Sequence, residues 1–261
     1  MIETKYKETA EFLQAAEMDK KEVTRITMDL PDLTVEKAYQ IQEELVSIKL
    51  KQGHRIIGPK MGLTSEAKMK QMNVEDPIYG YVFDYMDISD DGTISLKELI
   101  HPKVEAEIAF IIGKDLEGPG ITAQDVLSAT EYVIPALEII DSRYENFQFT
   151  LPDVIADNAS SSRVIFGNQL TKPERHELEL VGVTLSINGE IKDSGAGAAV
   201  LGHPANSVAM LANMLSRKGK KVSAGEIILT GGVTGAVLLS EGDHITAKFD
   251  GLGDISFRVT E

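Results

Sequence analysis

The sequence predicts an α+β protein in which a small helical N-terminal region precedes a mainly β core. Residues 1 to about 52 carry apolar side chains at helical spacing, whereas short β-like runs recur after residue 75. At 261 residues the chain suits one large domain, or a large domain with a small appendage. The sequence contains no internal repeat, low-complexity tract or disordered linker.

The N-terminal region contains one well-marked helix. Thr34 precedes a predicted helix that runs to about Lys51, and Gly53 would end it. Its expected packing stripe recurs at helical spacing and consists of Ala38, Ile41, Leu45 and Ile48. The segment 55–63, which contains Lys60, is then typical of a short strand followed by a turn.

The region after residue 75 is dominated by predicted strands. They are residues 79–83, 104–112, 133–140, 163–166, 180–187, 226–229, 244–249 and 254–259. Asn188-Gly189 predicts a tight hairpin, and residues 251–253 predict a second turn near the C-terminus. Two helices are expected to interrupt the strands, near 122–130 and 204–217.

The composition is that of a globular protein without disulfides, with 43% hydrophobic residues, 26% charged residues and no cysteine. No run approaches the roughly 20 apolar residues that span a bilayer, and the first residues do not resemble a signal peptide. We therefore expect a cytoplasmic enzyme with no membrane partner. The net charge of −15 argues against broad nucleic-acid binding, and an anionic substrate would need local cations or a metal.

Three acidic residues interrupt apolar runs near the middle of the chain. Glu105 and Glu107 lie two positions apart in a predicted strand, so their side chains project from one face. Glu138 interrupts a second apolar run, residues 133–140. Buried carboxylates are costly unless protonated, paired or metal-bound, and three that converge would form a hard oxygen site for Mg²⁺ or Mn²⁺. The alternatives are a half-exposed strand with a polar face and, for Glu138, a structural acid paired with an arginine.

Three further positions are candidates for contact with an anionic substrate. Lys60 lies in an apolar, glycine-bounded segment, where a lysine can hold an anion or act as an acid. Arg143 follows Glu138 closely, and Ser160 lies in a polar loop, so each can bind a carboxylate. The alternatives are a solvent-facing lysine, a surface ion pair for Arg143 and an ordinary loop around Ser160.

Other catalytic patterns are missing from the sequence. There is no Gly-x-Ser-x-Gly elbow, so serine-hydrolase chemistry has no support. Residues 195–199 lack the glycine spacing and the strand–turn–helix context of a dinucleotide fingerprint. The histidines are scattered, and His203 is better explained as a helix-entry residue than as a metal ligand.

Seven segments together resemble the fumarylacetoacetate hydrolase superfamily, specifically its hydratase and decarboxylase branch from aromatic meta-cleavage pathways. They are KMGLTS at 60–65, PIYG at 77–80, HPKVEAE at 101–107, IDSRYENF at 140–147, ADNASS at 156–161, GAGAAVLGHP at 195–204 and LTGG at 229–232. These segments follow in order along nearly the whole chain. The resemblance implies a metal-binding β-rich catalytic core of the fumarylacetoacetase C-terminal type over residues 76–261. It implies that a small α/β region, residues 1–75, contributes Lys60.

The resemblance also implies roles for the candidate residues. One Mg²⁺ or Mn²⁺ would be held by Glu105, Glu107 and Glu138, and Lys60 matches the family's active-site lysine. Apolar walls such as Leu63 and Ile78 would desolvate a departing carboxylate, and Arg143 or Ser160 would hold a carboxylate of the substrate.

The activity implied by the resemblance is that of a carboxy-lyase. It would convert 2-oxohex-3-enedioate, a dicarboxylate 2-oxo acid, to 2-hydroxypenta-2,4-dienoate and CO₂. Related hydratases usually carry an acid where this chain has Ile78, which favours decarboxylation over hydration of 2-oxopent-4-enoate. Hydrolysis of an acylpyruvate and a non-catalytic scaffolding subunit are further alternatives. The resemblance also implies a homo-oligomer and a complex with the pathway hydratase.

Overall fold

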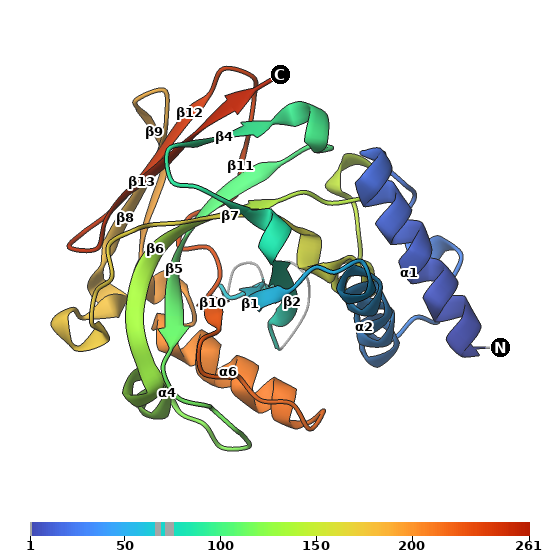
Figure 1. Cartoon of the computed structure of the whole chain (residues 1–261), viewed down its shortest axis with the longest axis horizontal. Helices are drawn as coiled ribbons and strands as arrows, with labels where there is room; N and C mark the ends of the chain where they lie inside the picture. Colours follow the sequence, from blue (N-terminus) through green and yellow to red (C-terminus); the bar gives the residue numbers. More distant parts are fainter. Residues whose placement is uncertain (1, 66–68, 71–75) are drawn as a thin grey trace.

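Two β-sheets form the framework of the computed structural model, which describes residues 2–65, 69–70 and 76–261 (Figure 1). The larger sheet has eight strands among these residues, seven of them in the order β2-β1-β10-β5-β6-β7-β3, with β11 paired to β5. Their bounds are β1 Ile56–Gly62, β2 Ile78–Phe83, β3 Asp87–Ile88, β5 Lys103–Ile112, β6 Thr130–Ile140, β7 Ser161–Phe166, β10 Ile227–Leu229 and β11 Val237–Leu238.

Within the described part of the chain, the second sheet has five strands in the order β4-β13-β12-β8-β9. Their bounds are β4 Gly92–Ser95, β8 Gly182–Ile187, β9 Glu190–Ala196, β12 His244–Phe249 and β13 Gly253–Thr260. The predicted Asn-Gly hairpin joins β8 to β9, where Asn188 and Gly189 adopt φ values of 53° and 81°. The left-handed backbone that a tight hairpin needs is therefore supplied by the two residues that favour it.

The helices pack outside the sheets and confirm the predicted α+β class. They are α1 Ile2–Asp19, α2 Val35–Lys51, α4 Ala123–Ala129, α5 Leu151–Ala156 and α6 Pro204–Ser216. In Figure 1, α1 and α2 lie together on one side of the molecule, whereas α4 and α6 lie beside the end of β5 and β6. The Thr34 hydroxyl caps α2 by accepting from Lys37 N at 3.4 Å, as its position before the helix predicted.

Strands β5 and β6 form the longest pairing of the larger sheet and position most of the candidate site. The residues from Val104 to Phe110 are all buried, because both faces of β5 are covered. The two strands run antiparallel, and Glu105 lies directly opposite Glu138 in their register. Directly opposed residues point to the same face of a sheet, so this pairing brings acids 33 positions apart together.

The outer edge of β2 is closed by side chains rather than by another strand. Gln42 donates its amide Nε2 to the Tyr79 carbonyl at 2.9 Å, and the Tyr39 hydroxyl accepts from Tyr79 N at 3.3 Å. The Asn158 amide accepts from Tyr81 N and donates to Tyr81 O, both at 2.8 Å. These contacts satisfy backbone groups that would otherwise offer a free edge for pairing.

A buried ion pair joins α1 and α2 to the body of the protein. Lys49 Nζ lies 2.7 Å from Glu17 Oε2 and 2.8 Å from the Tyr85 hydroxyl, which donates to Glu17 Oε1 at 2.7 Å. Burial lowers the pKa of Lys49. Burial alone would raise the pKa of Glu17, but the charges of Lys49 and Arg143, together with the hydrogen bonds from Lys49 and Tyr85, outweigh it, so the pKa of Glu17 is lowered.

The predicted division at residue 75 falls beside residues 71–75, which lie outside the described part of the chain. Strand β1, from the first region, pairs with both β2 and β10 from the second. The two regions therefore share one sheet. Among the described residues, no helix has the length and apolar character to cross a bilayer.

Candidate active site

Three buried glutamates and one buried lysine meet on one face of the larger sheet. Glu105, Glu107 and Glu138 are 7%, 0% and 1% exposed, and Lys60 is 3% exposed. Lys60 Nζ lies 3.1 Å from Glu138 Oε2, although β10 and β5 both lie between the strands that carry the two residues, β1 and β6. The pairing of β5 with β6 places Glu105 opposite Glu138, and the Lys60 side chain reaches the same cluster. The structure therefore brings these four candidate residues together.

Burial and mutual repulsion dominate the electrostatics of the acids. Burial raises the pKa of Glu107 well above its usual value, and the nearby Glu138 and Glu105 raise it further. Burial also raises the pKa of Glu138, and the Lys60 ammonium only partly offsets the effect. A cation among the three carboxylates would relieve both penalties, since an opposite charge favours the ionised form.

Two buried carboxylate oxygens of this cluster have no hydrogen-bond partner among the residues that the structure describes. They are Glu107 Oε1 and Glu138 Oε1. Glu107 Oε2 accepts from Gly231 N at 2.8 Å, so one oxygen of this carboxylate is held by the backbone and the other is left over. Orphaned buried oxygens in an acidic cluster fit a hard divalent cation.

The carboxylates do not form a ready-made metal site as they stand. Among residues 2–65, 69–70 and 76–261, no group of three or more His, Cys, Asp or Glu side chains is arranged to hold an ion. The Lys60 ammonium occupies the space beside Glu138. For the three carboxylates to bind one ion, their side chains would therefore have to rotate. The strand register already places them on one face of the sheet.

The backbone at residues 231–232 passes close to the acidic cluster. Gly231 has φ 102°, and a Cβ there would collide with the Thr64 side chain. A Cβ on Gly232 would collide with Glu105 Oε2. These glycines are required because the loop passes directly over the acids and donates the Gly231 amide to Glu107.

A left-handed loop supplies the second partner of Lys60. Asn158, Ala159 and Ser160 adopt φ values of 50°, 51° and 57° in succession. The loop is held by the Asn158 amide on Tyr81, and it directs the Ala159 carbonyl to Lys60 Nζ at 3.0 Å. Non-glycine residues seldom adopt this conformation, so three in a row mark a segment fixed by its surroundings.

A cavity of about 290 Å³ opens onto this cluster. Its lining residues are Lys60, Met61, Gly62, Leu63, Ile78, Lys103, Glu105, Glu138, Ile140, Phe147, Phe149, Val154, Ala159, Ser160, Gly232 and Ala236. The lining includes the predicted residues Leu63 and Ser160. Most of the wall is apolar, which strengthens the electrostatic interactions of the few charged groups inside it.

Arg143 has a different place from the one the sequence predicted. It does not line the cavity, and its guanidinium pairs with Asp157. It also donates to the carbonyls of Asp141 and Ser161 at 2.8 and 3.1 Å. Burial raises the pKa of Asp157 to about 6, and its charge raises the pKa of Arg143. This arrangement favours a structural role for Arg143, which ties β6, α5 and β7 together.

The sequence alone does not reveal two residues that line the cavity, or the position of one carbonyl. Lys103 precedes Glu105 by the same two-residue step that joins Glu105 to Glu107, but a lysine at the start of a strand does not by itself indicate a pocket. Phe147 ends a short 3-10 turn, Glu145–Phe147, and nothing local indicates that its ring reaches the cavity. The Ala159 carbonyl faces Lys60 only because of the left-handed loop, which has no glycine to reveal it.

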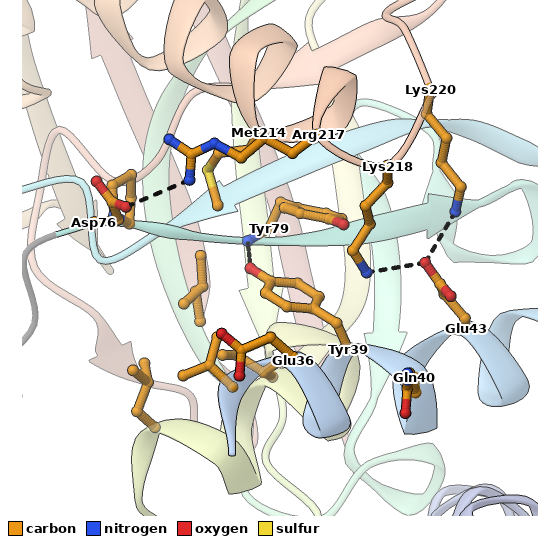
Figure 2. A pocket seen from close by; sticks show the side chains of 15 residues that line it. Glu36, Tyr39, Gln40, Glu43, Asp76, Tyr79, Met214, Arg217, Lys218 and Lys220 are labelled. Carbon is orange, nitrogen blue, oxygen red and sulfur yellow. Dashed lines mark hydrogen bonds and ion pairs between the residues drawn. The ribbon is translucent and has the colours of Figure 1, made fainter. Parts of the chain in front are cut away.

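A larger cavity of about 830 Å³ lies outside this site, between α2, β2 and α6 (Figure 2). Figure 2 shows Lys218 and Lys220 both turned toward Glu43, at 3.0 and 3.2 Å. The two cavities share the lining residue Ile78. The larger cavity lacks the three-glutamate cluster, so the smaller one is the candidate active site.

Comparisons with known proteins agree with the geometry. The chain is 50% identical over 249 residues to a 4-oxalocrotonate decarboxylase of Pseudomonas sp. strain CF600, covering 95% of this chain and 94% of that protein. It is 40% identical over 262 residues to a 2-hydroxyhexa-2,4-dienoate hydratase of Comamonas testosteroni, covering 100% and 98%. A solved structure of 4-oxalocrotonate decarboxylase from Pseudomonas putida G7, complexed with magnesium and adipate, matches with a TM-score of 0.97. The identity is 47%, and the match covers 98% of this chain and 97% of that one.

Residues 62–260 match the family described as fumarylacetoacetate (FAA) hydrolase C-terminal. This match covers both sheets apart from β1, of which it includes only the last residue, Gly62. With the two-sheet fold and the buried acidic cluster, it shows that the chain belongs to the fumarylacetoacetate hydrolase family.

Proposed function

We propose that this chain is a divalent-metal-dependent carboxy-lyase of aromatic meta-cleavage catabolism. It converts 2-oxohex-3-enedioate (4-oxalocrotonate) to 2-hydroxypenta-2,4-dienoate and CO₂. The observation that carries the proposal is the 50% identity to a 4-oxalocrotonate decarboxylase over 95% of the chain. The identity to the hydratase of Comamonas testosteroni is lower, 40% over 262 residues.

Glu105, Glu107 and Glu138 are the proposed ligands of one Mg²⁺ or Mn²⁺. They offer only oxygen donors, as these hard cations prefer, and two of those oxygens lack another partner. A similar decarboxylase structure was solved with magnesium bound. When bound, the ion would act as a Lewis acid on the 2-oxo group of the substrate.

Lys60 is the proposed proton donor. When the C5–C6 bond breaks, the electron pair of that bond forms a C4–C5 double bond. The C3–C4 double bond then shifts to C2–C3, and the π electrons of the C2 carbonyl move onto its oxygen. Lys60 Nζ donates a proton to that oxygen, and solvent later restores the proton. The Ala159 carbonyl and Glu138 hold the ammonium at the cavity wall, at 3.0 and 3.1 Å.

The apolar part of the cavity is proposed to surround the departing carboxylate. Leu63, Ile78 and Val154 offer it no hydrogen-bond donors. A carboxylate held in such a place is poorly solvated, whereas CO₂ has no charge to solvate, so the apolar wall favours bond cleavage. Ser160, which also lines the cavity, is proposed to contact the substrate through its hydroxyl.

The proposal extends to the protein's surroundings. We infer that the enzyme acts in the cytoplasm, where it assembles into a homo-oligomer and forms a complex with the pathway hydratase. The division into a small N-terminal region, residues 1–75, and a metal-binding core, residues 76–261, is part of the same proposal.

An ultraviolet assay with 2-oxohex-3-enedioate tests this function, with and without Mg²⁺ after chelation and with CO₂ measured in parallel. We expect Mg²⁺-dependent loss of the substrate with one CO₂ released per molecule consumed. Formation of 4-hydroxy-2-oxopentanoate from the dienol, without CO₂ release, would instead identify a hydratase. That second candidate is favoured by the full-length similarity to the hydratase of Comamonas testosteroni.

A further inference from the structure

Lys103 places a second cation in the candidate active site. It begins β5, and strand alternation puts it on the face that carries Glu105 and Glu107. It lines the cavity, as does its cross-strand neighbour Ile140. Lys60, the other cationic lining residue, is paired with Glu138, whereas no carboxylate of the described residues pairs with Lys103.

The Lys103 ammonium is held in place by an aromatic ring. Its Nζ lies 4.0 Å from the centroid of Phe147, which also lines the cavity. Phe147 adopts φ 58° directly after Asn146 at φ 55°, and its ring packs 4.8 Å from that of His101. A ring face attracts a cation without neutralising its charge, so Lys103 is positioned and still able to bind an anion.

The cavity is lined at its two ends by different pairs of strands. Strands β1 and β2 and the residue after β1 supply Gly62, Ile78 and Leu63 at one end. Lys60 also lies on β1, but its ammonium reaches Glu138 on β6. Strands β5 and β6 supply Lys103 and Ile140 at the other, and β10 lies between the two pairs of strands. The acids Glu105 and Glu138 lie on β5 and β6, beside the Lys103 end.

We propose that Lys103 is a substrate-binding residue that takes the carboxylate which the substrate keeps, the C1 group next to the 2-oxo carbon. This inference rests on the proposed decarboxylation. A cation at the departing carboxylate would stabilise the starting state more than the transition state, in which that group loses its charge. A cation at C1 carries no such cost, because this carboxylate stays charged throughout. The Lys103 contact therefore directs the departing end toward Leu63 and Ile78.

The test uses 2-oxopentanoate, which has the C1 carboxylate and the 2-oxo group but no distal carboxylate. Calorimetry with saturating Mg²⁺ measures its binding to the wild-type protein, to Lys103→Met, to Lys103→Arg and to Lys248→Met. Lys248 is an exposed lysine on β12 and serves as the matched control. Steady-state kinetics with 2-oxohex-3-enedioate run in parallel, and circular dichroism checks that each variant is folded.

We expect Lys103→Met to raise the Kd of 2-oxopentanoate by at least about tenfold, because a charge-assisted contact is lost. The KM for the dicarboxylate rises similarly while kcat changes by less than about threefold. Lys103→Arg regains most of the affinity, and Lys248→Met binds as the wild type does. An unchanged Kd for 2-oxopentanoate in a folded Lys103→Met protein would overturn the inference.

A second result would also overturn it. If Lys103→Met weakened binding of adipate, which has a carboxylate at each end and no 2-oxo group, but left 2-oxopentanoate unaffected, Lys103 would not be the C1 ligand. Failure of the proposed function looks different. The wild-type protein would then release no CO₂ from 2-oxohex-3-enedioate, while the calorimetry would still report whether Lys103 binds the 2-oxo acid.

Discussion

Glu107 shows most clearly what distinguishes a site residue from a structural one. Its side chain is fully buried, one oxygen is held by the Gly231 amide, and the other has no partner. Burial and the neighbouring acids raise its pKa. A carboxylate that only stabilised the fold would have found a cationic or hydrogen-bonding partner for both oxygens.

The first prediction concerns Glu107→Gln, which keeps the shape of the side chain and removes its charge. Without metal, the variant should melt at or above the temperature of the wild type, because a buried charge and its repulsion are gone. Millimolar Mg²⁺ should raise the melting temperature of the wild type, since a ligand stabilises the state that binds it. The variant should show a much smaller rise and almost no CO₂ release.

Differential scanning fluorimetry with and without chelator measures both effects. Glu131→Gln is the matched control, because Glu131 is an exposed acid on the same strand as Glu138. An equal Mg²⁺-induced rise in Glu107→Gln and the wild type would remove Glu107 from the ligand set.

For individual residues, the sequence was most informative where a local pattern decides which way a side chain points. Alternation placed Glu105 and Glu107 on one face, and an acid inside an apolar run drew attention to Glu138. Arg143 has no such pattern, because whether an arginine in a loop meets substrate or a buried aspartate depends on tertiary packing. Lys103 was overlooked because a lysine at the start of a strand is commonly exposed.

At the scale of elements, the loop 158–160 connects the strand edge to the site. Asn158 closes the edge of β2 through Tyr81, and the same loop presents the Ala159 carbonyl to Lys60. A change at Asn158 should therefore affect stability and activity together.

Asn158→Ala should reduce the free energy of unfolding by about 2–3 kcal/mol, because two buried hydrogen bonds are lost and alanine tolerates the left-handed backbone poorly. Asn158→Gly should lose about 1 kcal/mol less, since glycine adopts that conformation without penalty. Urea unfolding measures both variants. Equal losses would mean that backbone conformation contributes nothing here.

The ion pair between α1 and α2 makes stability depend on pH. Because the pKa of Glu17 is lowered by Lys49, the pair stabilises the fold above the ordinary pKa of glutamate. That contribution is lost as the pH falls through the lowered pKa. Lys49→Met should therefore cost about 2 kcal/mol near neutral pH, since Glu17 is left buried without its partner.

The loss in free energy of unfolding caused by Lys49→Met should be smaller at about pH 4, where a proton neutralises Glu17 in the variant. Urea titrations at the two pH values measure it, with Lys51→Met as the control, an exposed lysine on the same helix. A deficit that stayed constant with pH would show that Lys49 acts through packing alone.

Elements with strong periodicity were predicted well, whereas some short elements were missed. Helix α2 and strands β5, β6, β12 and β13 carry long runs or clear turn residues, and their predicted bounds agree with the structure to within three residues. Helix α5 was missed because six residues are too few to show helical periodicity, and the helix depends on capping by Asp153, which also accepts from Thr27. Strand β9 is mostly polar and exposed, so its sequence does not alternate as a half-buried strand would.

At the scale of the whole molecule, the two predicted regions share one sheet and one hydrophobic core. Apolar residues of α1 and α2, such as Leu13 and Ile41, belong to the same buried cluster as residues of both sheets. Scanning calorimetry should therefore give a single unfolding transition for the metal-free protein. Two separate transitions would mean that the N-terminal region unfolds on its own despite sharing the sheet.

Anomalous X-ray diffraction from crystals soaked in Mn²⁺ tests the central claim most directly. The account predicts one strong peak within about 2–2.5 Å of an oxygen from each of Glu105, Glu107 and Glu138, with the Lys60 ammonium displaced from Glu138. A fully occupied peak elsewhere, or three carboxylates that still point apart around Lys60 with no peak between them, would contradict it.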